Sequence, residues 1–519
     1  MLAPGAKKAH HTEPMEHKEK MGTESLRLYV CLLVLLAIPN LSASSSPEVA
    51  QQTQPNRGEM TSADLISQLN PPEAAVKSHI LVIEHKNISG DLKLGLEQLP
   101  IPFRVEFHDC EFRDNVVLVS VVFDQGLVFN NVTFDKAFEL TSVHVKGDLM
   151  LTNVHIVRSD EPSQPGKAKP TKMQLNQSQV DGDVRIKNPD VDKLEAENLA
   201  AGNVVVWLSK TGSPELDFIK LDTSGRLSVA ANAGTRANQL QLDGANIHET
   251  WTLQNLVFQT ITASSLTVTK RTQFLPTTIV EKRLDFAFSN LGNFDWEFPG
   301  GEPFRLPENL NIEGATFNTL HVAPVFSGTA NSEEEKETRW KARRTDYGLA
   351  FLEKAAYYES AYAAYEFLLK SQGRGDAADA VYFAMRDRRR YTEWKDAATF
   401  SGKTIAAMNY VIGFGHKWLF GYGRAWVYPI VWCMIFVFVG SFVFRDAALM
   451  EKQDEKAVST FSPLWYSMDL FVPVLSLGIA NRWRPKSEHE FLVFYAKLLS
   501  LVGLVFISAA LGALTGSLK

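Results

Sequence analysis

Asp469 is the ionisable residue with the most unusual position, because it interrupts a mostly apolar run from Leu464 to Ala480. A carboxyl group at membrane depth needs a partner or a hydrated cavity. Pro473 breaks the same run, and irregular backbone at that depth survives only where protein buries it or water lines it. The run predicts a half-inserted helix that turns at Pro473 and returns, with a third full span as the alternative. The candidate pore-lining residues are Asp469, Pro473, Ser476, Gly478 and Asn481.

A basic cluster is the second group of residues whose types suggest chemistry. It runs from Arg386 to Lys395 and precedes the apolar C-terminal region. Cationic side chains close to a membrane attract anionic lipid head groups, and an ordinary solvated helix end is the alternative. The candidates for lipid head-group binding are Arg388, Arg389, Arg390 and Lys395.

No group of residues in the sequence points to catalysis. Cys31, Cys110 and Cys433 lie far apart and predict neither a disulfide framework nor a cysteine-based zinc site. His108 and His144 stand at outward or turn positions of the pattern described below, and we interpret them as solvated. The sequence holds no clustered acid–base or nucleophile set. We therefore predict no catalytic residue, no metal and no cofactor; an enzyme acting on lipid or glycan is a third, less favoured hypothesis.

The composition limits the classes of protein and of partner. The chain has 519 residues, of which 45% are hydrophobic and 22% charged, so it is neither disordered nor collagen-like. Its 53 Lys and Arg residues face 59 Asp and Glu residues, for a formal net charge of −6. A nucleic-acid binder usually has a basic excess. We therefore expect no nucleic acid as a partner.

The N-terminal region carries a short apolar run over residues 29–41, followed by small residues. A spanning helix needs about 20 apolar residues, whereas a short run followed by small residues is typical of a secretory signal. We predict a signal peptide over residues 1–45 and a polar linker over residues 46–77. An uncleaved anchor or a buried apolar segment is the alternative.

The middle of the chain repeats with a period of eleven residues. Each unit has the pattern apolar-x-apolar, a short gap, and apolar-x-apolar again. Residues two apart in a strand share a face, whereas a helix would need apolar residues three and four apart. Each unit thus predicts two short strands, and successive units must stack to form a core. The twenty positions that carry the pattern are Val105, Phe107, Cys110, Phe112, Val116, Leu118, Val121, Phe123, Leu127, Phe129, Val132, Phe134, Phe138, Leu140, Val143, Val145, Leu149, Leu151, Val154 and Ile156.

A mainly β fold follows, with a β-solenoid over residues 78–328 and two eleven-residue units in each coil. Gly90, Gly147 and Gly182 each open a copy of Gly-Asp-apolar-x-apolar, and glycine there suits a bend with positive φ. The region resembles pentapeptide-repeat and related quadrilateral β-helix proteins, although its spacing alternates five and six and their usual triplets are mostly absent. The resemblance implies a right-handed quadrilateral solenoid that acts as a scaffold or binds a protein partner.

A helical connector is predicted over residues 332–424. Apolar and aromatic residues recur at helical spacing over 347–371, and a glycine-containing break at 372–375 precedes Asp376, a plausible N-cap. Two helices across a short turn predict an αα-hairpin. Residues 404–424 are amphipathic and predict a helix that lies in the membrane interface.

Two apolar segments frame the Asp469 region and predict a two-span transmembrane domain over residues 425–519. Ala425–Phe444 has no charged residue, and Phe491–Leu514 has one, Lys497, near its start. Both are long enough to cross a bilayer. Gly503 and other small residues in the second segment permit close approach of helices.

The order of span, pore-helix-like segment and span is that of two-helix cation channels. With Gly421–Gly423 before the first span and Leu464–Asp469 after it, the region resembles bacterial pentapeptide-repeat membrane proteins with an ion-channel-like C-terminal domain. Some of those relatives are labelled membrane-associated oxidoreductases, but this sequence has no redox motif. The resemblance implies a bacterial inner (cell) membrane location and a homo-oligomer, a tetramer by channel analogy. Val474–Asn481 lacks the potassium filter sequence Thr-Val-Gly-Tyr-Gly, so potassium selectivity is not expected.

Two signals disagree about membrane topology. The signal peptide would place the solenoid outside the cytoplasm, whereas eight basic against three acidic residues between Arg386 and Arg424 favour the cytoplasm for that segment. Long translocated domains can escape the charge rule, so we expect a periplasmic or extracellular solenoid. The function expected is an oligomeric channel-like membrane protein with an extracytoplasmic sensing or gating solenoid. The alternative is a non-conducting, membrane-anchored solenoid scaffold that binds a protein partner or the cell wall.

Overall fold

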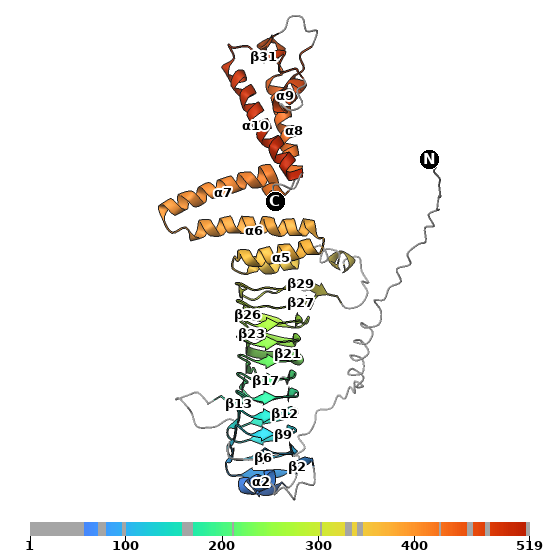
Figure 1. The fold of residues 1–519 in the computed structure, drawn as a ribbon, viewed down its shortest axis with the longest axis vertical. Helices are drawn as coiled ribbons and strands as arrows, with labels where there is room; N and C mark the ends of the chain where they lie inside the picture. The colour runs from blue at the N-terminus through green and yellow to red at the C-terminus, as the bar shows by residue number, and fades with distance from the viewer. Residues whose placement is uncertain are drawn as a thin grey trace, which may run out of the picture. The chain divides into compact units, whose positions relative to one another are not determined.

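The computed structural model describes most of the chain after residue 56, in which a region mainly of strands precedes a region mainly of helices (Figure 1). The predicted signal peptide, Pro473 and Ser476 lie outside the described residues. The described ranges are 57–70, 79–95, 100–157, 170–209, 212–300, 304–326, 335–339, 346–424, 427–453, 460–472 and 478–514.

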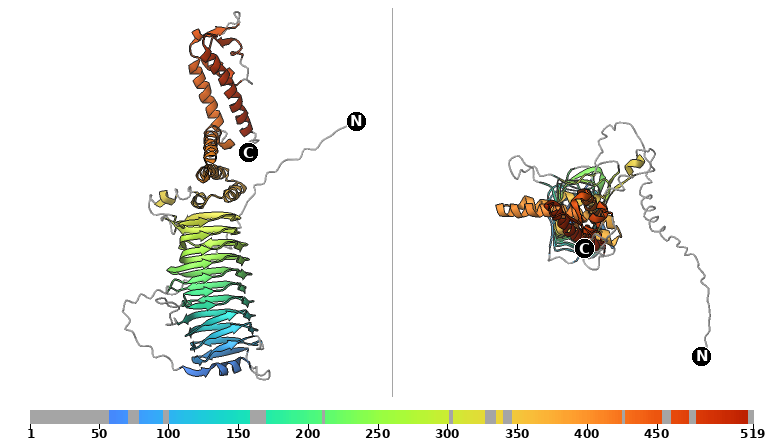
Figure 2. Two further views of the ribbon diagram at one scale, coloured as in Figure 1. Left: turned by 90° about the vertical axis from the view of Figure 1, so that its left-hand side faces the viewer. Right: turned by 90° about the horizontal axis from the view of Figure 1, so that it is seen from above.

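Parallel strands stack coil on coil into a β-solenoid of about ten turns (Figure 2). Leu127 pairs with Val105 on one side and with Leu149 on the other, so equivalent residues of neighbouring coils are 22 apart. This spacing confirms the prediction of two eleven-residue units in each coil.

The solenoid strands belong to two sheets. Seven short strands form the smaller one: β8 Val122–Phe123, β11 His144–Val145, β14 Gln179–Val180, β17 Ala200–Ala201, β20 Asp222–Thr223, β22 Asn246–Ile247 and β24 Thr267–Val268. The larger sheet contains β1 Gly58–Thr61, β2 Ile80–Glu84, β3 Lys86–Ser89, β4 Leu92–Leu94, β5 Arg104–His108, β6 Glu111–Phe112, β7 Val116–Val119, β9 Leu127–Phe134, β10 Phe138–Thr141, β12 Leu149–Ile156, β13 Lys172–Gln174, β15 Val184–Lys187, β16 Lys193–Glu195, β18 Val204–Leu208, β19 Glu215–Asp217, β21 Leu227–Gln241, β23 Thr250–Thr262, β25 Arg271–Phe274, β26 Ile279–Asp285, β27 Asn293–Pro299, β28 Asn309–Asn311 and β29 Thr319–Val325.

The core of the solenoid is built from the repeat positions. All twenty apolar positions identified in the sequence are at most 5% exposed. Because equivalent residues lie above one another, aromatic rings stack between coils: the Phe107 and Phe129 ring centroids are 5.0 Å apart, and those of Phe112 and Phe134 are 5.1 Å apart. Each such pair contributes about 0.5–1.5 kcal/mol beyond simple burial.

Of the three glycines predicted to make bends with positive φ, only Gly90 does so, and the repeating bend lies elsewhere in the unit. Asp109, Asn131 and Asn153, 22 residues apart, have φ values of 54°, 55° and 50°. Asp109 lies between β5 and β6, whereas Asn131 and Asn153 occupy the equivalent position within β9 and β12. Asp and Asn tolerate this left-handed conformation because their short polar side chains can bond locally. In the units between them, Ser120 and Ser142 have φ values of 57° and 56°. In these coils the repeating bend is therefore made by Asp, Asn and Ser at the unit centre.

The Gly-Asp glycines have a different role from the one predicted. Gly90 has a φ of 89°, but Gly147 and Gly182 are not among the residues with positive φ, so the prediction is wrong for them. At these two positions there is no room for a side chain. A Cβ on Gly147 would lie 1.8 Å from the carbonyl oxygen of Gln125, and a Cβ on Gly182 would lie 2.8 Å from the carbonyl oxygen of Gly147. Glycine allows neighbouring coils to approach at this edge.

Part of the predicted linker is folded. Strand β1 pairs with β3, and helix α2 (Ser62–Leu69) follows it. Thr61 and Asp64 form a reciprocal capping box at the start of α2, and Leu65 and Leu69 are buried on one helix face. The linker prediction is wrong for these residues. It rested on the polar composition of the whole segment and overlooked Leu65 and Leu69, which are four residues apart, and the Thr61 cap before them.

Helices follow the solenoid. Their bounds, with those of a small hairpin, are α4 Tyr347–Lys354, α5 Glu359–Ser371, α6 Gly375–Asp396, α7 Phe400–Phe420, η2 Gly421–Gly423, α8 Val427–Val443, η3 Ala447–Leu449, β30 Met450–Lys452, α9 Pro463–Phe471, β31 Trp483–Pro485 and α10 Glu490–Leu514.

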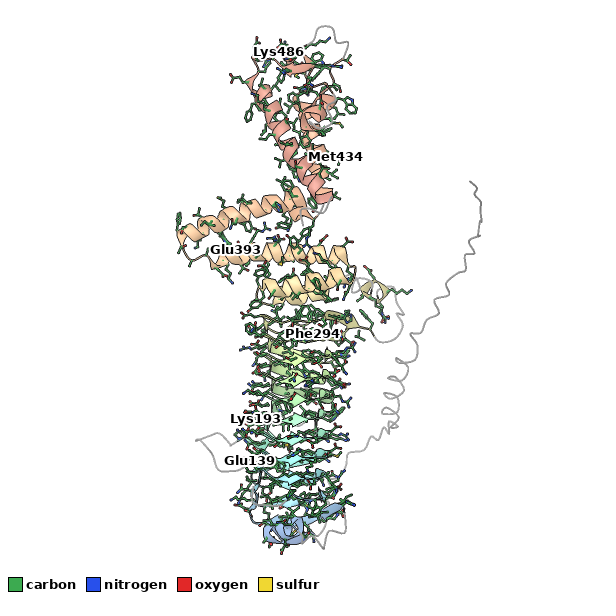
Figure 3. All side chains as sticks on the ribbon, viewed as in Figure 1. Glu139, Lys193, Phe294, Glu393, Met434 and Lys486 are labelled. Carbon is green, nitrogen blue, oxygen red and sulfur yellow. The ribbon has the colours of Figure 1, made fainter. Side chains whose placement is uncertain are left out.

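The αα-hairpin is formed by α5 and α6, but two details differ from the prediction. The helical pattern over 347–371 is divided into α4 and α5, and the Arg388 guanidinium donates to the carbonyl oxygens of Leu352 and Ala355 at the end of α4. Helix α6 begins at Gly375 rather than after an Asp376 cap. Helix α4 packs on the last coils, where the Phe351 ring lies 5.7 Å from that of Phe294 (labelled in Figure 3).

Among the described residues, one helix is long and apolar enough to cross a membrane, over Glu490–Ser508 of α10. Helices α7 and α8 would give a second candidate if that pair, bent by 113°, formed one span. Helix α9 ends at Phe471 after nine residues. Helix α9 therefore does not continue as one helix to Ala480, as the alternative of a third span would require.

Candidate functional site

Helix α9 packs between α8 and α10 and is the core of the candidate site. Its residues Tyr466, Ser467, Asp469 and Phe471 are buried. The Tyr466 ring lies 5.0 Å from the Phe444 ring at the end of α8. The opposite face of α9 carries Leu464 and Trp465, which are about half exposed (47% and 49%). One face of α9 is thus held within the chain, while the other is left uncovered by the described residues.

Two glycines let α9 lie this close to its neighbours. A Cβ on Gly440 of α8 would lie 3.0 Å from the Ser467 hydroxyl oxygen. A Cβ on Gly503 of α10 would lie 1.9 Å from the carbonyl oxygen of Phe471. The close approach predicted at Gly503 is confirmed, and its partner is the end of α9.

Helix α9 ends near the middle of the two long helices. The Phe471 and Phe436 ring centroids are 6.0 Å apart, and the Phe436 and Phe506 centroids are 5.3 Å apart. Phe436 and Gly503 both lie near the middle of their helices. The C-terminal end of α9 therefore lies at mid-length of the α8–α10 pair.

The chain returns to the side from which α9 entered. The Phe461 ring, just before α9, lies 5.3 Å from the ring of Trp483, with which β31 begins. Strands β30 and β31 pair antiparallel, with Lys452 opposite Trp483 and Met450 opposite Pro485. Helix α9 thus begins, and the described residues between it and β31 end, beside this pair of strands.

Asp469 joins α9 to the segment that follows it. Its Oδ2 atom accepts hydrogen bonds from the backbone N–H groups of Ile479 and Ala480, each at 2.7 Å, and the residue is 7% exposed. Two amide donors on one carboxylate oxygen explain how the charge is accommodated. The partner that the Asp469 carboxyl group was expected to need is the backbone of Ile479 and Ala480.

The other pore-lining candidates lie in or after the returning segment. Gly478 has a φ of 72°, and Asn481 is exposed. The contacts of Asp469 join α9 to the residues between these two candidates. The pore-lining role of these residues stays a prediction.

The arginines of the basic cluster have partners within the chain, which the sequence did not indicate. Arg388 is directed inward: its guanidinium also donates to the Tyr362 hydroxyl at 2.9 Å. Arg389 pairs with Glu393 at 2.9 Å and with Glu359 at 3.3 Å. Arg390 pairs with Asp387, and Lys395 is exposed. Lipid binding by these four residues stays a prediction.

A second basic site, missed in the sequence, links the helical hairpin to α8. The Arg424 guanidinium, three residues before α8, binds Glu366 of α5 at 2.6 Å and Asp379 of α6 at 3.1 Å. It also lies 3.5 Å from the centroid of the Tyr382 ring. Arg424 was counted only as one of the basic residues near the membrane, because nothing in the local pattern indicated partners so distant in sequence.

Two carboxyl groups of the helical connector, one in the Arg424 link and one between α6 and α7, stay ionised at neutral pH. Burial alone would raise the pKa of Glu366, but hydrogen bonds from Lys370 and Arg424 hold it below its usual value of 4.5. Burial opposes ionisation of Asp387 too, yet Lys417 and the Tyr422 hydroxyl hold its pKa below 3.8. Asp387 thereby ties α6 to α7 and η2, as Glu366 ties α5 to Arg424.

Replacing Arg424 with alanine should weaken the junction between α5, α6 and α8. We expect a loss of about 1–3 kcal/mol in the free energy of unfolding, less than for a fully buried pair, because Asp379 is partly exposed and Glu366 keeps Lys370. Thermal unfolding of the detergent-solubilised protein would measure it. Because the pKa of Glu366 is lowered, the difference from wild type should be full above pH 4.5 and shrink as the pH falls through that lowered pKa. An undiminished difference in strong acid would contradict the ionic link.

Comparison with known proteins gives no family for the chain. No protein-family model matches it, and no curated protein or solved structure matches it.

Proposed function

We propose that the chain is an oligomeric, channel-like membrane protein whose α9 is a re-entrant pore helix. The observation that carries the proposal is the position of α9: it enters beside β31, ends at mid-length of α8 and α10, and returns to the same side. Short helices that stop halfway through a bilayer are tolerated where protein buries them or water lines them. In this proposal α8 and α10 are the two spans.

Exposed apolar faces support a membrane location. Soluble monomers rarely expose large contiguous apolar patches, yet large side chains are exposed along α7, α8 and α10. On α8 and α10 they include Met434 (labelled in Figure 3), Phe438, Phe442, Phe491, Phe494, Leu501 and Leu504. On α7 they include Phe400, Ile405, Met408, Val411, Ile412, Phe414 and Trp418, as suits a helix that lies in the interface.

Assembly into a homo-oligomer follows from the channel hypothesis. Two spans and one returning segment cannot enclose a pore alone, and α9 has an uncovered face with Leu464 and Trp465. Several copies around an axis would bring these faces together. We propose a tetramer, by analogy with two-helix cation channels.

The solenoid would act as the sensing or gating domain. It contacts the helices through α4, and Arg424 joins the hairpin to the start of α8. A partner bound to the coils could thus bias the position of a spanning helix. We place the solenoid in the periplasm or outside the cell and the spans in a bacterial cell membrane, which the predicted signal peptide and the resemblance favour.

One observation favours the alternative, a non-conducting scaffold anchored in the membrane. The charge of Asp469 is satisfied by backbone N–H groups of its own chain, and α9 buries its inner face without a second copy. Such a helix needs no hydrated lumen. The solenoid would then be displayed for a protein partner or the cell wall.

Subunit counting and conductance distinguish the two functions. The purified full chain is expected to be a symmetric oligomer and to pass current in planar bilayers. A charged thiol reagent should change the current of Trp465→Cys, on the open face of α9, and leave that of Phe442→Cys, on the outer face of α8, unchanged. A monomer without current would overturn the channel proposal and support the scaffold.

A further inference from the structure

A surface cavity of about 410 Å³ lies between α6 and α7. Three guanidinium groups, those of Arg386, Arg389 and Arg390, line it from α6, and His416 lines it from α7. Glu393 is the carboxylate in the lining; Figure 3 labels it on α6. The lining holds three guanidinium groups and one carboxylate, an excess of positive charge that favours an anionic ligand; Asp387 and Glu359, outside the lining, pair with Arg390 and Arg389.

Arg390 is the most informative of these residues. Its side chain is 12% exposed and uses Nη2 to bind Asp387. Its Nε and Nη1 atoms are buried and have no hydrogen-bond partner among the described residues. Unsatisfied buried donors on a charged group are costly. The guanidinium also lies 5.4 Å and 5.5 Å from the centroids of the Tyr410 and Tyr422 rings, which offset part of that cost. Arg390 therefore adds positive charge behind the cavity wall, and its two unpaired donors would reach acceptor oxygens of a ligand only if the side chain turned.

The other two arginines keep donors for the same ligand. Arg386 donates from Nε and Nη2 to the Tyr382 hydroxyl, which is a neutral acceptor and leaves the charge uncompensated by that contact. Arg389 pairs with Glu393 and Glu359, but is 43% exposed, where ion pairs exchange readily with other anions. Phosphate oxygens match guanidinium geometry. The chemistry of the cavity is that of a phosphate site.

The side chains around the cavity indicate which class of molecule carries the phosphate group. Ile412 lines the cavity and is 59% exposed, and it continues into the exposed apolar side chains of α7 that include Met408 and Val411. A ligand that filled both regions would carry a phosphate next to hydrocarbon.

We propose that the cavity between α6 and α7 binds the phosphate of an anionic phospholipid, with the acyl chains along α7. This inference rests on the membrane location proposed above and does not depend on conduction. The site differs from the residues predicted in the sequence: Arg389 and Arg390 line it, Arg386 joins them, and Arg388 and Lys395 do not line it.

The test uses the full chain in a neutral detergent with short-chain phosphatidylglycerol as the probe, measured by native mass spectrometry. The variant is Arg386→Gln/Arg389→Gln, which spares the Arg390–Asp387 pair. Its matched control is Lys395→Gln/Lys403→Gln, which removes two charges from the same helices at exposed positions outside the cavity. We expect the cavity variant to lose roughly tenfold or more in affinity, and the control variant to bind like wild type.

Three outcomes would overturn the proposal. Equal losses in both variants would mean diffuse attraction to a basic surface. Binding of inorganic phosphate or glycerol phosphate as tight as that of the lipid would mean a site for free phosphate rather than a lipid. No binding by wild type, with thermal unfolding showing it folded, would mean that the cavity takes no phosphate. None of these outcomes changes the subunit count or the conductance, so the lipid site and the channel proposal fail separately.

Discussion

Gly503→Ala should destabilise the helical domain by about 2–3 kcal/mol or detach α9 altogether. Alanine is favoured over glycine in a helix by about 1 kcal/mol, so propensity alone predicts the opposite sign. The added Cβ, however, would lie 1.9 Å from the carbonyl oxygen of Phe471. Backbone cannot rotate away as a flexible side chain can, and overpacking of a fitted core costs about 1–3 kcal/mol or more. Thermal unfolding in detergent would measure the loss.

Gly415→Ala provides the matched control. Gly415 also lies within a helix, α7, and a Cβ there would meet nothing within 4 Å. The same substitution should be neutral or slightly stabilising at that position. Hydrogen exchange over residues 460–472 should rise in Gly503→Ala alone, because α9 loses its contact. If both variants resemble wild type, α9 does not dock on Gly503, and the geometry behind the proposed pore helix is wrong.

The solenoid was largely predictable because the same short pattern of buried and exposed residues recurs in every coil. The eleven-residue pattern specified the strands, the coil length and the buried face, since every coil meets the same requirement as the next. What the pattern did not reveal was which residues bend the chain. Asn131 and Gly147 both allow unusual backbone, but only the three-dimensional stack shows that Asn131 has positive φ and that Gly147 is limited by the coil beside it.

The candidate site was predictable in part. Apolar length and a buried carboxyl indicated that the segment around Asp469 does not cross as one helix. The partners of Asp469 are backbone N–H groups ten and eleven residues away. Because every residue except proline has a backbone N–H, the sequence cannot indicate which of them will act as the donor. Arg424 and Glu366 are 58 residues apart, so their pairing depends on how the helices pack. Residue types showed which groups need partners, and packing determined the partners.

Asp469→Ala should have the largest effect in the helical domain, a loss of about 2–5 kcal/mol. The substitution removes the acceptor of two backbone donors at once, and each buried unsatisfied donor costs about 1–3 kcal/mol. Asp469→Asn should cost about half as much, because a single oxygen, Oδ2, accepts both bonds and an amide retains one oxygen. Thermal unfolding of both variants in detergent would measure this order. Asp446→Ala is the control: this exposed carboxylate accepts one N–H, from Ala448, and its loss should cost about 1 kcal/mol.

The two variants of Asp469 also separate a structural role from a conducting one. If the carboxylate serves to close the returning segment, Asn should retain most of the stability and any change in current should follow the folded fraction. If its charge faces a permeation path, Asn should alter the current of protein that is fully folded, because removing a charge ring changes ion occupancy without breaking the hydrogen bonds. Equal stability of Asp469→Ala and wild type would contradict the first role, since the N–H groups of Ile479 and Ala480 both donate to Oδ2 of Asp469.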